Sequence, residues 1–162
     1  MESNPYEKLI FKPQRNLNAD ESLRLLNEAF ENKDPGVVEE AIFEILPSEE
    51  FTDKFSEIFC KLLMENWHYQ HENIVLILQG LKDPSTVDYL YNAAELQFEY
   101  RAYDDYGEFA RKCTWALADI GTPEANAKIQ ILAQNKNLLI AESAQKRLDN
   151  WEEELSRKGA SR

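Results

Sequence analysis

Apolar residues recur at steps of three and four along most of this chain, and this spacing constrains the fold more than any other feature. Leu23, Leu26 and Phe30 follow it, which places the three side chains on one face of a helix. The alternation of apolar and polar residues that marks a strand is nowhere sustained. The five glycines and six prolines fall between the periodic segments, as is typical of residues that start and end helices. The sequence therefore predicts an all-α fold.

The predicted helices form four antiparallel pairs in a single domain, because 162 residues with 43% apolar content suffice for one core. We expect the helical domain over residues 20–155, after an N-terminal extension at residues 1–19 and before a frayed tail at residues 156–162. The predicted pairs cover about residues 20–46, 48–81, 84–120 and 123–155.

Individual residues predict where several helices begin and end. Asp20 is expected to cap the first helix, and Ser48 to open a capping box at the start of the second pair. Pro35 and Pro123 are expected in first turns, where a missing N–H has no consequence, and Gly121 at a helix end. Phe98 is assigned to the first helix of the third pair. The last helix is predicted to run without a break over residues 138–155.

Two turns between successive pairs are similar to each other. Residues 81–90 read LKDPSTVDYL and residues 120–125 read IGTPEA, and each leads into a helix through a proline. Residues 110–148, ARKCTWALADIGTPEANAKIQILAQNKNLLIAESAQKRL, resemble one HEAT-like repeat and half of the next, of the short variety found in phycobilin lyase subunits. The resemblance implies a short α-solenoid of HEAT-like helix pairs, whose curved surface binds partners. It specifies architecture rather than function.

The charge of the chain limits its partners. Eighteen basic and thirty acidic residues give a net charge of −12, which opposes binding to nucleic acid and to anionic membranes. Residues 1–81 carry sixteen acids and seven bases, so the excess lies in the first half. We expect the partner to be another protein, and a basic one. A solvated acidic coat that keeps the protein soluble is an equally weighted interpretation.

The N-terminal residues predict no targeting to a membrane. MESNPYEKLIFKP lacks the charged start and apolar run of a secretory signal. No later stretch approaches the ~18 apolar residues that a membrane helix requires. We therefore expect a cytoplasmic location.

Two unusual turns carry the candidate binding site. Each joins the two helices of one pair, and the pairs are neighbours, so the turns are expected to lie side by side at one edge of the solenoid. Exposed aromatic side chains with polar groups are typical of binding hot spots. The candidate partner-binding residues of the two turns are Trp67, His68, Tyr69, His71, Glu99, Tyr100, Tyr103, Asp104, Asp105 and Tyr106. Further candidates on the second helices of the pairs are Glu39, Glu40, Glu72, Glu108 and Arg111.

Other interpretations of these turns remain open. The aromatic side chains can instead tuck inward as a lid over the helix ends. The two histidines with Asp104 and Asp105 could hold a metal or act as acid and base, although no His or Cys elsewhere supports them. The chain has no Gly-rich phosphate loop and no serine elbow. Cys60 and Cys113 fall in apolar helical stripes, which predicts buried free thiols. We expect no catalytic residue, no metal and no cofactor.

Together these features predict a non-catalytic protein-binding module. The chain resembles small acidic immunity proteins, some of them HEAT-like, that occlude a basic, nuclease-like bacterial toxin. We expect a monomer when free and a heterodimer with the partner. Two alternatives remain. An accessory subunit of a bilin-lyase-type enzyme predicts a concave apolar pocket, and a generic scaffold or adaptor predicts no inhibitory activity.

Overall fold

The computed structural model describes residues 17–46, 52–104 and 106–160, and within these ranges every regular element is a helix. The α-helices are α2 (Ala19–Asn32), α3 (Pro35–Ile45), α4 (Ser56–Leu63), α5 (His71–Leu81), α6 (Val87–Glu95), α7 (Gly107–Ile120), α8 (Pro123–Leu132), α9 (Leu138–Asp149) and α10 (Trp151–Ala160). Short 3-10 helices are η1 (Asp53–Phe55), η2 (Pro84–Thr86) and η3 (Glu99–Asp104). None of the described helices is long and apolar enough to cross a membrane.

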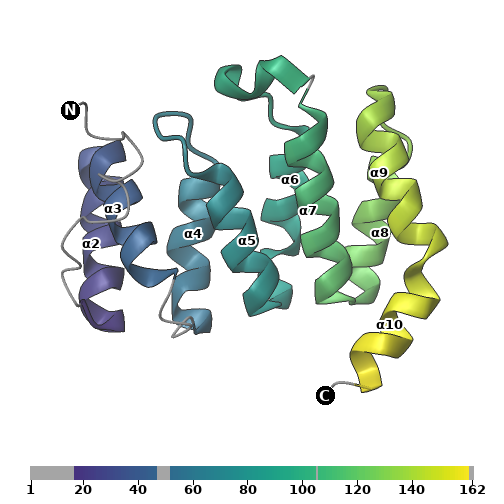
Figure 1. Ribbon diagram of the computed structural model, residues 1–162, viewed down its shortest axis with the longest axis horizontal. Helices are drawn as coiled ribbons and strands as arrows, with labels where there is room; N and C mark the ends of the chain where they lie inside the picture. The colour runs from purple at the N-terminus through teal and green to yellow at the C-terminus, as the bar shows by residue number, and fades with distance from the viewer. Residues whose placement is uncertain (1–16, 47–51, 105, 161–162) are drawn as a thin grey trace, which may run out of the picture.

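The helices stand side by side in one row of pairs (Figure 1). Pairs α2–α3, α4–α5, α6–α7 and α8–α9 pack internally, and each first helix contacts the next first helix along the row. The second helices α5, α7 and α9 contact one another in the same order. The fold is therefore all-α and has the form of a short α-solenoid, as the apolar spacing predicts.

The helix starts follow from local hydrogen bonds. The Asp34 carboxylate accepts a hydrogen bond from the backbone N–H of Val37, directly before Pro35 opens α3. The Thr122 side chain caps α8 in the same way before Pro123. The first helix departs from the prediction, since Asn18 rather than Asp20 is its cap. Asn18 directly precedes the helix, and its side-chain oxygen accepts a hydrogen bond from the backbone N–H of Glu21 at 2.8 Å, whereas Asp20 lies within the first turn.

Three further expectations need correction. The last predicted helix breaks at Asn150, where α9 ends and α10 sets off in a new direction (Figure 1). Helix α10 continues to Ala160, past the point where we placed the frayed tail. Helix α6 ends at Glu95, so Phe98 lies in the following turn rather than in the helix. The predicted capping box at Ser48 lies outside the described residues.

One continuous core runs along the row. It takes the inward faces of all four pairs, from Leu26 in α2 to Ala144 in α9. Phe55 and Phe59 stack in it with ring centroids 5.9 Å apart, and Phe98 is buried with it although it lies outside a helix. Stacking of pairs thus buries the apolar faces that one pair alone would leave exposed.

Candidate functional site

The two turns that join α4 to α5 and α6 to α7 lie side by side, as expected, at the upper edge in Figure 1. The rings of Tyr69 and Tyr100 meet edge to face, with centroids 5.2 Å apart and planes at 89°. The Tyr100 hydroxyl also reaches Nδ1 of His71 at 2.5 Å, across 29 residues of sequence. The solenoid therefore brings the aromatic residues of two neighbouring pairs into direct contact.

His68 lies inside the protein, contrary to its assignment as a partner-binding residue. Its side chain is fully buried. The ring Nε2–H donates to the backbone carbonyl of Leu62 at 2.6 Å, and the backbone N–H of Gln70 donates to Nδ1 at 3.0 Å. Burial is the main reason that the pKa of His68 is lowered. A neutral ring fits this pattern, because one nitrogen donates and the other accepts.

His71 is also fully buried and cannot meet a partner directly. Its Nε2–H donates to the carbonyl of Glu65 at 2.6 Å, while Nδ1 accepts from the Tyr100 hydroxyl. The ring is stacked between His68 and Phe98, with centroids at 4.2 Å and 3.8 Å. Burial, followed by the charge of neighbouring His68, lowers the pKa of His71 to about 3. We refer to His68, His71 and Phe98 as the histidine stack.

The histidine stack serves the end of α4. The last carbonyls of a helix have no donor within the helix, and here the two rings donate to Leu62 and Glu65, at and just beyond that end. Because His71 also holds Tyr100, one buried unit joins the end of α4 to the turn before α7. The turns are therefore braced from within.

The aromatic residues of the turns divide between the surface and the interior. Tyr69 and Tyr103 are 68% and 76% exposed. Trp67 and Tyr100 are half-buried and pack against the core, and the Trp67 indole N–H donates to the Glu65 carboxylate at 2.9 Å. We refer to Trp67, Tyr69, Tyr100 and Tyr103 as the aromatic rim. The inward-tucking interpretation is therefore confirmed for Trp67 and Tyr100, whereas Tyr69 and Tyr103 are exposed and their role in binding stays a prediction.

A pocket of about 660 Å³ opens between the two turns. Its lining residues are Asn66, Tyr69, Gln97, Phe98, Glu99 and Tyr100. Three of the predicted site residues line it. Tyr69 and Tyr100 belong to the aromatic rim, and the third is the exposed Glu99.

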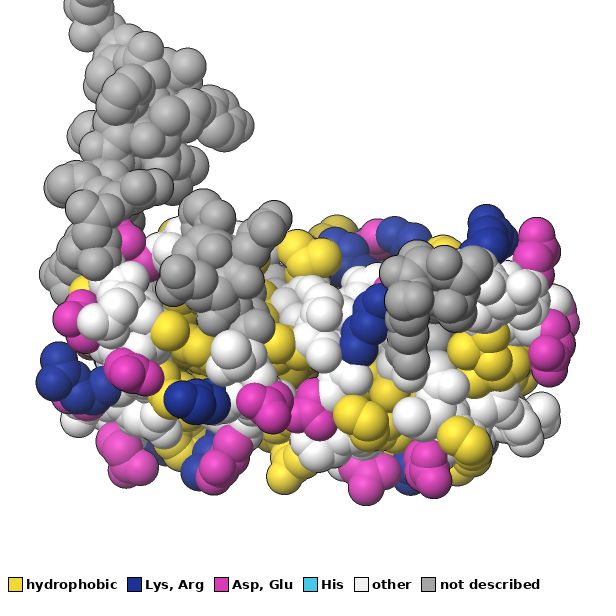
Figure 2. All heavy atoms as spheres, turned by 90° about the horizontal axis from the view of Figure 1, so that it is seen from below, with side chains coloured by type: hydrophobic (Ala, Val, Ile, Leu, Met, Phe, Trp, Pro, Cys, Tyr) yellow, Lys and Arg dark blue, Asp and Glu magenta, His cyan; other side chains and the backbone are white. Residues whose placement is uncertain are grey.

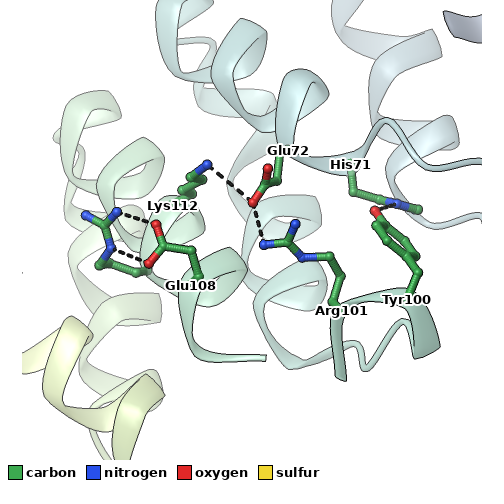
Figure 3. Close-up of polar contacts among 7 residues, drawn as sticks. His71, Glu72, Tyr100, Arg101, Glu108 and Lys112 are labelled. Atoms are coloured by element: carbon green, nitrogen blue, oxygen red, sulfur yellow. Dashed lines mark hydrogen bonds and ion pairs between the residues drawn. The ribbon is translucent and has the colours of Figure 1, made fainter. Parts of the chain in front are cut away.

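Glu72, Glu108 and Arg111 belong to a row of ion pairs on α5 and α7. Figure 3 shows Glu72 and Glu108 within this row. Glu72 is paired with the buried Arg101 of η3, and Lys112 Nζ lies 3.3 Å from Glu72 Oε1. Arg111 Nη2 donates to Glu108 Oε1 at 2.5 Å, and this bond is the main reason that the pKa of Glu108 is lowered. The carboxylates of this row are neutralised by groups of the same chain.

The remaining candidates lie apart from the rim or beyond what is described. Glu39 and Glu40 are half-buried on α3, in the first pair. The Tyr106 side chain is half-buried. Its backbone has the left-handed conformation, with φ of 64°, at the start of α7. Asp105 and the side chain of Asp104 lie outside the described residues, so their predicted role in the site stays a prediction.

Acidic side chains are spread over the molecule rather than gathered at the rim. Residues 17–46 carry eight acids and two bases. Figure 2 views the long edge of the row that lies opposite the rim. Acidic side chains occur along the whole length of this edge, with basic and apolar side chains between them. The negative charge therefore acts as a field around the protein.

Metal-ligating groups and thiols can be examined in the described part of the chain. No group of three His, Cys, Asp or Glu residues in it could hold a metal ion. Cys60 and Cys113 are free and buried, as the sequence predicts. Burial raises the pKa of Cys60 to about 12 and raises that of Cys113 as well, which keeps both thiols protonated and poorly nucleophilic.

Sequence reasoning missed Phe98, Arg101 and Lys112. Phe98 carries the stack on His71, Arg101 pairs with Glu72, and Lys112 adds a second cation to the same carboxylate. A signal for Arg101 was present, since it is the one basic residue between Tyr100 and Tyr106.

A second groove, of about 500 Å³, lies between α7 and α9. Its wall contains Trp115, with the Arg147 guanidinium carbon 3.3 Å from the ring centroid. The charged residues in its lining are Glu108, Arg111, Glu142, Lys146 and Arg147. The groove thus combines charged side chains with the ring of Trp115 and the side chain of Leu139.

Comparison of the chain with known protein-family models, with curated proteins and with solved structures found no match.

Proposed function

We propose that the chain is a non-catalytic binding module that holds one basic protein through the aromatic rim, as a stoichiometric inhibitor of the immunity type. The observation that carries the proposal is the exposure of Tyr69 and Tyr103 at 68% and 76% beside an open pocket. Tyrosines that combine an apolar ring with a polar hydroxyl are typical of binding hot spots.

The brace beneath the rim supports this function. Binding is weakened by every side chain and loop that must be ordered in the complex. Here the turn of α4–α5 and the turn of α6–α7 are already joined by the bond from Tyr100 to His71 and by the stack of His71 on Phe98. A partner would meet a surface whose shape is set in advance.

The charge supports a basic partner. A net charge of −12 attracts a cationic protein over a distance comparable to the Debye length of ~8 Å and slows encounter with acidic ones. The acid-rich first pair strengthens the field at one end of the row. Such steering raises the rate of association, while close contacts at the rim decide how long the complex lasts.

The chemistry of the two histidines supports a role in binding rather than catalysis. A general base needs a pKa near the working pH and access to a proton of the substrate. His71 is buried, has a pKa lowered to about 3, and uses both ring nitrogens for hydrogen bonds within the protein. Its place in the fold is that of a brace.

Affinity capture tests the proposal. The tagged full chain is incubated with an extract of the cell that makes it, washed at low and then at raised salt, and bound proteins are identified by mass. We expect one basic protein in equal amount, and a loss of affinity of about 30-fold with Tyr69→Ala or Tyr103→Ala, as for hot-spot residues of ~2 kcal/mol. Tyr89→Ala is the matched control, because Tyr89 is a 42% exposed tyrosine on α6, away from the rim.

Three outcomes would contradict the proposal in different parts. Recovery of an acidic partner removes the role of the charge. An equal loss of affinity for the partner in Tyr89→Ala and Tyr69→Ala would show that the aromatic rim is not the binding surface. A basic partner whose own activity is unchanged when the chain is in excess leaves a scaffold or adaptor instead of an inhibitor.

A further inference from the structure

We propose that the pocket between the two turns receives a cationic side chain, arginine or lysine, from the partner. This step rests on the proposed function, because it names the group by which the basic partner enters the rim. Its basis is the combination of aromatic walls and oxygen acceptors in one preformed cavity of about 660 Å³.

The lining favours a cation on chemical grounds. Three aromatic residues, Tyr69, Phe98 and Tyr100, contribute ring surface, and the faces of such rings attract ammonium and guanidinium groups. The polar side chains of the lining are those of Asn66, Gln97 and Glu99. They supply two amide oxygens and one carboxylate, which are acceptors for the N–H groups of lysine or arginine.

Among the described residues that line this pocket, none is basic. Arg101, which follows Tyr100 in the chain, has its guanidinium carbon 5.9 Å from the Tyr100 ring centroid. It is buried and paired with Glu72, as Figure 3 shows, and Glu72 is also approached by Lys112. The positive charge of Arg101 is therefore compensated within the protein, whereas the exposed Glu99 carboxylate is offered to the pocket.

The walls are positioned before a ligand arrives. The Tyr100 hydroxyl is bound to His71 and its ring meets that of Tyr69 at 89°. The two rings thus form adjoining walls, and Tyr69 keeps 68% of its surface free for a ligand. A guanidinium group fits such a corner well, because it is planar, weakly hydrated and able to stack on a ring while donating to a carboxylate.

The test is a nuclear magnetic resonance titration of the full chain with N-acetyl-arginine methylamide at constant ionic strength. The citrulline analogue, which has nearly the same shape and no charge, is the matched control. We expect saturable shifts at residues 66–70 and 97–100, with the side-chain amides of Asn66 and Gln97 among them, and none of this pattern with citrulline.

Variants then assign the binding to the pocket. Glu99→Gln is expected to weaken the arginine probe by about two- to fivefold, as for an exposed ion pair, and Tyr69→Ala by a similar factor through loss of a cation–π contact. Glu124→Gln is the control, because Glu124 is an exposed carboxylate in the first turn of α8, at the edge of the row opposite the rim. Neither Glu99 nor Tyr69 is buried, so the variants keep the fold.

Equal shifts with citrulline, an unchanged affinity in Glu99→Gln and Tyr69→Ala, or no shift at the lining residues would each overturn this inference. The proposed function would survive such a result if Tyr69→Ala still releases the captured basic protein. Conversely, probe binding at the pocket with no captured protein would leave the cation site standing and remove the inhibitor.

Discussion

The hydroxyl of Tyr100 lies 2.5 Å from Nδ1 of His71, and this bond joins two helix pairs at the edge where they are most exposed. The same ring of His71 donates from Nε2 to the carbonyl of Glu65. One imidazole therefore connects the end of α4, the start of α5 and the turn before α7. The aromatic rim stands on this connection.

The stability of the protein is expected to fall in mild acid. His71 has a pKa of about 3 when folded and about 6.5 when unfolded, so the unfolded chain binds the extra proton between these values. The contribution of His71 to the free energy of unfolding is fully present above about pH 6.5 and is lost as the pH falls. For one such histidine the loss is about 2 kcal/mol at pH 5. Urea denaturation at pH 7.5 and pH 5 measures the decline. His71→Gln removes the titrating group, and an equal decline in this variant would contradict the assignment.

Tyr100→Phe is expected to destabilise the fold by about 1–3 kcal/mol. The substitution keeps the ring but removes the donor to Nδ1 of His71, and an unsatisfied buried acceptor has this cost. Tyr103→Phe is the matched control, because Tyr103 is 76% exposed, and its effect is expected to stay within about 0.5 kcal/mol. Thermal denaturation followed by circular dichroism compares the two. Similar changes in both variants would show that the hydroxyl of Tyr100 has no special place.

Gly107→Ala is expected to destabilise the contact of α7 with α9. A Cβ at residue 107 would lie 3.0 Å from the Cβ of Leu139 and 2.9 Å from its Cδ1. The Leu139 side chain must therefore rotate and its Cβ shift by a few tenths of an ångström, at a cost of about 1 kcal/mol. Gly80→Ala is the control, since nothing lies within 4 Å of its added Cβ on α5. There the helix propensity of alanine is expected to stabilise by about 0.5–1 kcal/mol. The packing is supported if Gly107→Ala lowers the midpoint of denaturant unfolding and Gly80→Ala raises it.

Glu154→Ala is expected to loosen α10 from α9. Arg147 Nη1 donates to Glu154 Oε1 at 2.9 Å, and the two side chains are only 10% and 13% exposed. Loss of a hydrogen bond between charged, nearly buried groups costs about 1.5–3 kcal/mol. Hydrogen exchange of the amides of α10, together with denaturant unfolding, measures the change.

Glu153→Ala provides the control for that experiment. Glu153 pairs with Arg157 along the same helix, with both side chains about 70% exposed. Such a pair contributes at most a few tenths of a kcal/mol. Equal exchange rates in the two variants would mean that the Arg147–Glu154 pair does not hold α10.

Local signals predicted much of the fold. Pro35 and Pro123 begin α3 and α8, and Gly121, with φ of 72°, ends α7, because these residues act through backbone geometry that is written in a few neighbouring positions. The break at Asn150 was missed because the apolar spacing runs on through Trp151. The pairing of Arg147 with Glu154 spans the break and joins the two helices, and Trp151 packs against the core.

The candidate site was predicted in part. The adjacency of the turns followed from the pairing of helices, and the contact of Tyr69 with Tyr100 confirms it. The burial of His68 and His71 could not be predicted, because it depends on carbonyls six residues earlier that lack donors in three dimensions. A polar residue in a turn looks exposed until the helix end that it satisfies is known.

In the described chain the main helix contacts are within pairs and between neighbouring pairs, and this has a consequence for how the sequence of such a protein can change. The acids of the first pair, Tyr69 and Tyr103 are not part of the buried core of the row. Substitutions at these residues leave that core unchanged, and under the proposed function they are the ones that would change recognition. Under the proposed function, related proteins could exchange one partner for another through substitutions at these surface residues. The stacked helix pairs would be kept while the sequences diverge.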